Sequence, residues 1–285
     1  MEPQLRVGPW IYIYWILDER AFYFFFVVLC IDYGISLPSP FLQTRLQIYS
    51  NMKTCLIQVL YDCDEFVALN KPSGMYLTTN DEERTQSLEN ILLDVGMSLS
   101  TLNMDGSRGF AHRLDRGTSG CLIVTKNNEA HAEWISRFFL RQVKKSYTCL
   151  VDTGRNTMLP QHEGIIDHPV GGRPAESAYS LMERYGRRAA RLQVSTLQGR
   201  KHQVRVHCSR GLNAPIILDP RYGGEQIIGQ LKSNTMKQCH SMGRFCLHAD
   251  TLQVSSLGLS VTAEVPSWWD DIVDDIKNFP FDLQS

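Results

Sequence analysis

The sequence lacks the patterns that would assign it to a class at once. Its eight cysteines include no Cys-x-x-Cys pair, and no internal repeat is visible along its 285 residues. Positive and negative charges nearly cancel, with a formal net charge of −1 and a pI near 6.7. These absences argue against the disulfide framework of a small secreted protein, a repeat architecture, and a polycation that binds nucleic acid through bulk charge.

Metal-binding patterns are scarce as well. The nearest approach is Cys239-His240 followed by Cys246 and His248. Zinc sites with two close pairs normally space the members of each pair more widely, so we expect no metal. The cysteines are instead expected to be reduced and mostly buried, in an intracellular protein. The cytoplasm is the first expectation for its compartment, and a mitochondrial or nuclear location stays open.

Long apolar runs are also missing, because the two at residues 7–17 and 21–31 are separated by Asp18, Glu19 and Arg20. Each run has about half the length that a membrane-spanning helix needs, and a single span would place three charges at its centre. A secretory signal and a transit peptide fit poorly too. We interpret residues 1–51 as an N-terminal extension whose role stays open: membrane association of residues 7–31, a packed arm, or a segment absent from the mature protein.

What is present is an ordinary globular composition, 43% hydrophobic and 21% charged, in a chain long enough to bury a sizeable core. Over residues 52–279, strand-like and helix-like segments mix without a strict βαβ rhythm. This favours one α+β domain with a central, mainly antiparallel sheet flanked by helices, followed by a tail at 280–285. Strands are predicted at 58–61, 66–71, 121–125, 146–151, 175–185, 188–197, 245–254 and 259–265. Helices are predicted after Ser87, after Asn127 or Asn128, at 201–210 and at 270–279.

The near-neutral total hides an uneven distribution of charge. Residues 108–150 carry a net charge of +5 and residues 173–210 a net charge of +7, whereas the chain from Glu264 onward carries −5. Charge runs usually form solvated faces, but two basic stretches in one domain can also form a groove that follows phosphates. The charge pattern alone leaves both interpretations open.

Chemically suggestive residues concentrate in four stretches. Residues 112–120 read His-Arg-Leu-Asp-Arg-Gly-Thr-Ser-Gly and place Asp115 between two arginines. Residues 144–151 place Tyr147 on a strand that begins with two lysines, and residues 199–207 read Gly-Arg-Lys-His-Gln-Val-Arg-Val-His. The fourth stretch combines residues 70–74, 219–223 and 247–249. Taken singly, each has a structural explanation, such as an ion pair for Asp115 or packing for Tyr147.

Taken together, these stretches resemble the RluA-type family of RNA pseudouridine synthases. That family shares Asn-Lys-Pro-x-Gly, His-Arg-Leu-Asp-x-x-Thr-Ser-Gly, Lys-x-Tyr, Gly-Arg-Thr-His-Gln-Ile-Arg-Val-His, Asp-x-x-Tyr-Gly and Leu-His-Ala. All six occur here in family order between Asn70 and Ala249, so the resemblance covers essentially the whole domain. It implies a pseudouridine-synthase-like catalytic domain with a basic cleft.

The resemblance also implies an activity, the isomerisation of uridine to pseudouridine in structured RNA such as rRNA or tRNA. The target base would be flipped out of its stack, with Arg113 filling the vacated space or holding the backbone. Asp115 would be the nucleophile, Arg205 would hold and aim it, and Tyr147 would stack on the uracil near the proton that leaves. No atom is gained or lost, so the reaction implies neither a cofactor nor a metal.

Further residues are expected to contact the RNA: Lys71, Arg116, Lys201 and His202. Lys71 and residues 219–223 are expected to be structural or RNA-contacting rather than chemical. Four histidines are expected to be mainly packed and hydrogen-bonded rings: His112, His202, His207 and His248.

The departures from the family pattern are mild. Lys201 stands where the family usually has Thr, Val204 where it has Ile, and Leu218 where a Gly often precedes the Asp. The small RNA-binding domain that many relatives carry upstream is not recognisable in residues 1–51. The main alternative is a catalytically silent RNA-binding or RNA-chaperone protein on the same fold. A zinc-dependent deaminase is a third candidate, but its His-x-Glu and Cys-x-x-Cys ligands are missing.

Overall fold

The structure is a computed structural model that describes residues 27–30, 45–50, 53–78, 87–102, 108–154, 162–186, 188–231 and 233–278. Two short strands, β1 (Val27–Cys30) and β2 (Arg45–Ser50), are the parts of the predicted N-terminal extension that it describes. Most of residues 7–31, for which membrane association was considered, and the tail at 280–285 lie outside the described residues. None of the helices in the described ranges has the length and apolar character needed to cross a bilayer.

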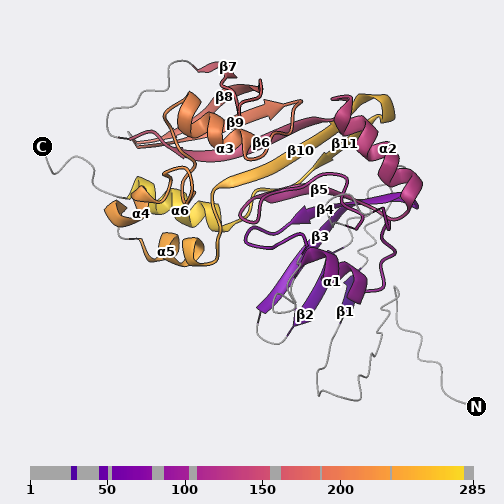
Figure 1. Cartoon of the computed structure of the whole chain (residues 1–285). Coiled ribbons are helices and arrows are strands. Elements are labelled where there is room, and N and C mark those ends of the chain that lie inside the picture. The colour runs from indigo at the N-terminus through magenta and orange to yellow at the C-terminus, as the bar shows by residue number, and fades with distance from the viewer. Residues whose placement is uncertain are drawn as a thin grey trace, which may run out of the picture.

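One mixed sheet organises the described chain (Figure 1). The strands run in the order β1-β2-β3-β4-β5-β10-β6-β9-β8-β7, with β11 paired to β10. Among the strand pairs of the described residues, β5 with β10 is parallel and the others are antiparallel, which confirms the mainly antiparallel sheet. The remaining strands are β3 (Lys53–Asp62), β4 (Phe66–Lys71), β5 (Ser119–Thr125), β6 (Lys144–Asp152), β7 (Glu163–Asp167), β8 (Glu176–Tyr185), β9 (Ala189–Thr196), β10 (Leu247–Val254) and β11 (Leu259–Thr262).

Helices cover the sheet and begin where the sequence provides caps. The Ser87 side chain accepts a hydrogen bond from the Asn90 amide at the start of α1, and Asn127 does the same for Ala130 at the start of α2. The predicted helix at 201–210 is divided into a short α3 and one turn of π-helix at His207–Gly211. The helices are α1 (Leu88–Asp94), α2 (Asn128–Phe139), α3 (Gln203–Val206), α4 (Gln226–Leu231), α5 (Asn234–Ser241) and α6 (Trp268–Lys277).

Side chains along β4 and β5 point alternately into two core layers, one on each face of the sheet. Val67 and Leu69 point to the layer that packs on α1, whereas Phe66 and Ala68 point to the layer that packs on Trp134 of α2. Because strand side chains alternate between faces, both faces of these two strands are buried. A third and larger layer lies between strands β6, β8 and β9 and the helices α3 and α6.

The site lies where the two halves of the sheet meet. Strand β10 stands between β5 of the first half and β6 of the second, and Figure 1 shows the halves on either side of it. Tyr147 of β6 packs against both the α1-side layer and the large layer of the second half. The Gly120 backbone at the start of β5 approaches Ala249 of β10 so closely that a side chain there would collide with its carbonyl. The predicted loop at 112–120 is thereby fixed against the centre of the sheet.

Candidate active site

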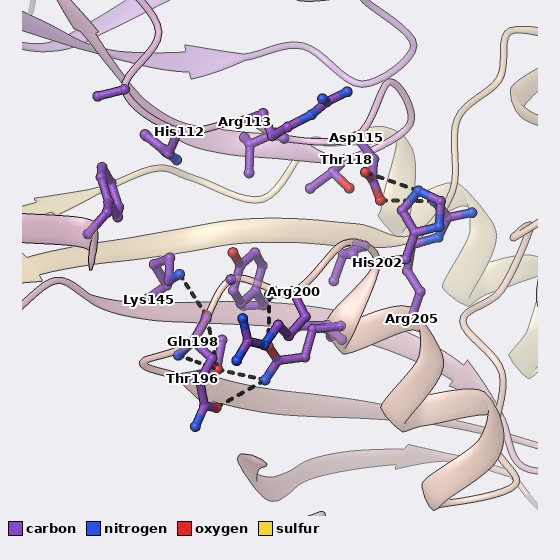
Figure 2. A pocket seen from close by; sticks show the side chains of 18 of the residues that line it. His112, Arg113, Asp115, Thr118, Lys145, Thr196, Gln198, Arg200, His202 and Arg205 are labelled. Atoms are coloured by element: carbon purple, nitrogen blue, oxygen red, sulfur yellow. Dashed lines mark hydrogen bonds and ion pairs between the residues drawn. The ribbon is translucent and has the colours of Figure 1, made fainter. Parts of the chain in front are cut away.

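A pocket of about 420 Å³ opens at this junction (Figure 2). Its walls come from the loop before β5, the end of α2, the start of β6, and the segment from Thr196 to Arg205. Among the described residues that line it, Asp115 is the one acid, whereas Arg113, Lys145, Arg200 and Arg205 supply cations. The predicted basic cleft is present, and it contains a single carboxylate.

Asp115 is held by a charge-assisted hydrogen bond. Arg205 donates through Nη1 to Asp115 Oδ2 at 2.9 Å, and the backbone of Asp115 accepts from the Thr118 amide at 3.0 Å. The Asp115 side chain remains 24% exposed, whereas that of Arg205 is 7% exposed. The carboxylate is therefore fixed from behind while it still faces the pocket.

The guanidinium of Arg205 is itself fixed by a second acid. Its Nε and Nη2 donate to the two carboxylate oxygens of the fully buried Asp219 at 2.7 and 2.8 Å, a bidentate pair. The ring of Phe245 lies 4.5 Å from the guanidinium carbon. Burial opposes the charge, but the hydrogen bonds and charges of Asp219 and Asp115 together raise the pKa of Arg205 above its usual value. Arg205 is thus a rigid, permanently charged bridge between two carboxylates.

The turn that carries Asp219 explains one departure from the family pattern. Leu218 has a left-handed backbone with φ of +69°, a conformation that a glycine adopts without strain. Its side chain is fully buried, and its amide donates to the Gly224 carbonyl at 2.8 Å. Burial of this leucine therefore compensates for the strained backbone, and the turn still presents Asp219 to Arg205.

His202 lies on the other side of Asp115. Its Nε2 is 3.5 Å from Asp115 Oδ1, and its Nδ1 is 2.9 Å from the Tyr222 hydroxyl. The residue has a left-handed backbone, with φ of +60°, just before α3. Burial and the neighbouring cations, chiefly Arg205 and Arg221, lower the pKa of His202 despite the opposing charge of Asp115. At neutral pH the ring is therefore a neutral hydrogen-bonding group beside the carboxylate.

Lys71 and Arg116 are not among the residues that line the pocket. Lys71 is fully buried, and its ammonium donates to the carbonyls of Pro72, Met75 and Arg116. Arg116 donates through Nε to the Gly74 carbonyl at 3.0 Å. These bonds fasten the loop after β4 to the Asp115 loop. Both residues were expected to contact RNA. The buried ammonium of Lys71 is instead an internal anchor, whereas the side chain of Arg116 is exposed.

Tyr147 lines the pocket from strand β6. Burial, together with the charge of Asp115, raises the pKa of its hydroxyl well above the usual value. Within the described residues, the hydroxyl makes no hydrogen bond to a side chain or a backbone group. The ring is therefore a neutral aromatic surface whose hydroxyl is available to a ligand.

The wall opposite Asp115 carries Lys145, as Figure 2 shows. The Lys145 ammonium donates to the Gln198 carbonyl at 2.7 Å, and burial lowers its pKa to about 8. His112 accepts a hydrogen bond from the Ile123 amide at 2.9 Å, and its ring packs against Phe138 with the two ring planes tilted by 34°. Burial and the charge of Lys145 lower the pKa of His112 to about 3, so this ring stays neutral.

The pocket brings together Asp115, Tyr147, Arg205, Arg113 and His202 among the predicted site residues. Arg113 is exposed at its edge, and Lys201 lines a neighbouring pocket instead. Lys145, Phe139 and Arg200 are among the lining residues that the sequence did not indicate as site candidates. Phe139 is 84% exposed at the end of α2, an unusual position for a large aromatic side chain.

The remaining histidines and cysteines have structural surroundings. His248 is buried between the Ser119 hydroxyl at 2.9 Å and the Ala263 carbonyl at 3.1 Å, and His207 lies 2.9 Å from the His168 carbonyl. The six cysteines whose side chains are described are free, as expected for them. Within the described ranges, no three His, Cys, Asp or Glu side chains are grouped so that they could hold a metal ion.

A profile of the RNA pseudouridylate synthase family matches residues 65–210, just over half of the chain. The match spans Asp115, Tyr147 and Arg205. The chain belongs to the RNA pseudouridylate synthase family. The RluA-type resemblance is thereby confirmed, because curated relatives include ribosomal large subunit pseudouridine synthases C and D.

Two curated relatives show the extent of the similarity. An uncharacterized RNA pseudouridine synthase of Zymomonas mobilis is 30% identical over 73% of this chain and 93% of its own length. Ribosomal large subunit pseudouridine synthase D of Pseudomonas aeruginosa is 28% identical over 70% of this chain and 63% of its own length. The chain therefore spans less than two thirds of the second relative.

The fold agrees with solved structures of the same family. Human RNA pseudouridylate synthase domain containing 4 superposes with a TM-score of 0.59 at 20% identity, covering 77% of this chain and 92% of that one. Human RNA pseudouridylate synthase domain containing 1 gives a TM-score of 0.56 at 21% identity, covering 79% and 96%. These similarities confirm the predicted fold class.

Proposed function

We propose that this protein isomerises uridine to pseudouridine in structured RNA, rRNA or tRNA, with Asp115 as the nucleophile. The observation that carries the proposal is the partly exposed Asp115 carboxylate, held by Arg205 in a pocket whose other charged lining residues are cations. Such a pocket attracts a polyanion and offers its sugar one activated oxygen. Family membership supports the reaction class, and the relatives' names support RNA as the substrate.

The proposed chemistry balances without any co-reactant. An Asp115 oxygen attacks C1′ of the flipped uridine, and the bond between C1′ and N1 breaks with its electrons going to the uracil. The uracil turns so that C5 faces C1′. C5 then bonds to C1′ and displaces the Asp115 carboxylate, after which the C5 proton leaves and N1 ends protonated. No electrons are gained or lost by the nucleoside as a whole.

The neighbouring groups have separate roles in this proposal. Arg205 positions the carboxylate, since its guanidinium is fixed on its far side by Asp219. Tyr147 stacks on the uracil, and Arg113 holds the flipped backbone from the pocket edge. His202 contacts the RNA beside Asp115, and Lys201 contacts it from the neighbouring pocket. These roles require extrusion of the base, because a stacked uridine hides its C1′ from a side chain.

Replacing Tyr147 by Phe should separate stacking from proton transfer. The ring is kept, so RNA affinity should stay within about threefold of the parent protein. The hydroxyl, which is protonated at neutral pH, can relay the C5 proton, so its loss should lower kcat by about 100-fold, the lower range for acid–base catalysis. Single-turnover kinetics and filter binding measure both quantities. An unchanged kcat would show that the hydroxyl transfers no proton and that Tyr147 acts only by stacking.

Lys145 should make RNA binding depend on pH. Its pKa of about 8 means that the ammonium is charged below pH 8 and is lost as the pH rises through that value. Affinity should therefore fall by roughly fivefold between pH 7 and pH 9, since about 1 kcal/mol from one charge-assisted contact disappears. Lys145→Arg should abolish the decrease.

The matched control is Lys144→Arg, because Lys144 is the exposed neighbour on the same strand. That variant should keep the decrease of the parent protein. Affinity that is constant from pH 7 to pH 9 in the parent protein would exclude Lys145 from the RNA contacts.

Transcripts of rRNA and tRNA made in vitro contain no pseudouridine and are suitable substrates. Incubation with the protein, carbodiimide labelling and primer extension should reveal labelled sites. The alternative, a silent RNA-binding protein, predicts complexes without any labelled site. Asp115, Tyr147 and Arg205 are all present and assembled, which favours the enzyme.

A further inference from the structure

A second pocket of about 360 Å³ lies beside the active site. It is bordered by the turn between β7 and β8, by α3 and its π-helical continuation, and by the turn after Asp219. A small apolar cluster of Val170, Ala175 and Val206, with Tyr222 packed against it, holds these three segments together. The pocket is thus built on packed elements from three different parts of the chain.

The charged groups that line this pocket all have one sign. Five of the lining residues are Arg or Lys, a sixth is His202, and none of the described lining residues is an acid. Within the described residues, none of these five side chains forms an ion pair with a carboxylate, in contrast to the paired Arg188 and Arg205. The five cations are Arg173, Arg200, Lys201, Arg210 and Arg221.

Two residues connect this pocket to the active site. Arg200 and His202 line both cavities, and His202 approaches Asp115 to 3.5 Å. The buried Nε of Arg200 has no hydrogen-bond partner within the described residues. Buried donors are normally satisfied, so an acceptor is expected at this position. The potential of the neighbouring cations also reaches His202, since Arg221 and Lys201 contribute to lowering its pKa.

We propose that this second pocket binds the phosphate groups of the RNA nucleotides next to the target uridine. Phosphodiester oxygens match the unpaired guanidinium and ammonium donors, and the shared wall at Arg200 and His202 leads the strand to Asp115. Five cations exceed what one small anion neutralises, which favours a continuous strand over a free phosphate or nucleotide. The inference deepens the proposed function by assigning a path for the RNA backbone.

The test removes three cations that lie away from Asp115. In the variant R173Q/R210Q/R221Q, all three replaced residues are exposed, so the fold should be retained. Binding is measured with a fluorescent mixed-sequence single-stranded RNA at several salt concentrations. If each residue neutralises one phosphate, the slope of log affinity against log salt should decrease by about 2, and affinity at low salt should fall at least about tenfold.

The matched control changes net charge equally but outside both pockets. Arg108, Arg184 and Lys237 are exposed and line neither cavity, and the variant R108Q/R184Q/K237Q should keep the salt slope of the parent protein. Equal slopes for the two triple variants would overturn the inference, because bulk charge would then explain any loss. The inference would also be overturned if inorganic phosphate or a free nucleotide displaced the RNA with a Kd below that of the RNA. That result would indicate a small-anion site.

Failure of this inference and failure of the proposed function give different results. Suppose that the parent protein makes no pseudouridine, and that R173Q/R210Q/R221Q lowers the salt slope whereas the control variant does not. The phosphate site then stands and the isomerase proposal fails. If the parent makes pseudouridine and this variant binds RNA like the control, the isomerase proposal stands and the phosphate site fails. With both correct, R173Q/R210Q/R221Q raises KM by at least about tenfold and changes kcat much less.

Discussion

Asp115→Asn should produce a folded protein that binds RNA but makes no detectable pseudouridine. Asn keeps the size of the side chain and one acceptor for Arg205 Nη1, but its amide cannot attack C1′. Arg205 keeps both hydrogen bonds to Asp219, so the loss of stability should be small. RNA affinity should stay within about tenfold, or about 1.4 kcal/mol, of the parent protein. Carbodiimide labelling measures the product and filter binding the affinity.

Asp94→Asn is the matched control for this substitution. Asp94 is an exposed acid at the end of α1 and lines neither pocket, so its variant should remain fully active. If Asp115→Asn retained more than a few percent of the parent rate, the carboxylate would not be the nucleophile. The pair with Arg205 would then be only a structural ion pair.

Replacing Arg205 by Met should have the largest effect on stability. The change leaves Asp219 buried without its bidentate partner, and breaking a buried pair in this way costs about 3–5 kcal/mol. Activity should be lost as well, since Asp115 loses its positioning group. Urea unfolding monitored by tryptophan fluorescence measures the free energy of unfolding.

Two further variants separate charge from geometry at this position. Arg205→Lys keeps a cation but not the planar fork, so it should recover part of the stability and little of the activity. Arg137→Met breaks an i,i+4 pair with the exposed Glu133 and should cost less than about 1 kcal/mol. A similar loss for Arg205→Met and Arg137→Met would show that the buried network contributes little to the fold.

Local sequence signals predicted much of the fold. Ser87 and Asn127 cap their helices because each side chain accepts a hydrogen bond from the backbone amide three residues further along the chain. The expected hairpin at 175–197 is present as β8 and β9. Strand β7 was not predicted, because its five residues have one buried side chain and a weak alternation. The helices α4 and α5 are short and were missed for a similar lack of signal.

The site was predicted less completely, because its geometry depends on contacts distant in sequence. Family motifs placed Asp115 and Arg205 in one site, and the structure brings them into a hydrogen bond across 90 positions of chain. No local pattern shows that Asp219 is fully buried against Arg205 or that Lys71 faces inward. The charge excess at 173–210 indicated a basic surface. The sequence did not show that its basic residues line two separate pockets that share Arg200.

Release of the C5 hydrogen tests the central claim most directly. RNA transcribed with uridine that carries tritium at C5 should lose one tritium to water for every pseudouridine formed, because C5 gives up its hydrogen when it bonds to C1′. The parent protein should release tritium in proportion to the sites that carbodiimide labels, and Asp115→Asn should release none. RNA binding by the parent protein without any tritium release from rRNA or tRNA transcripts would contradict the account.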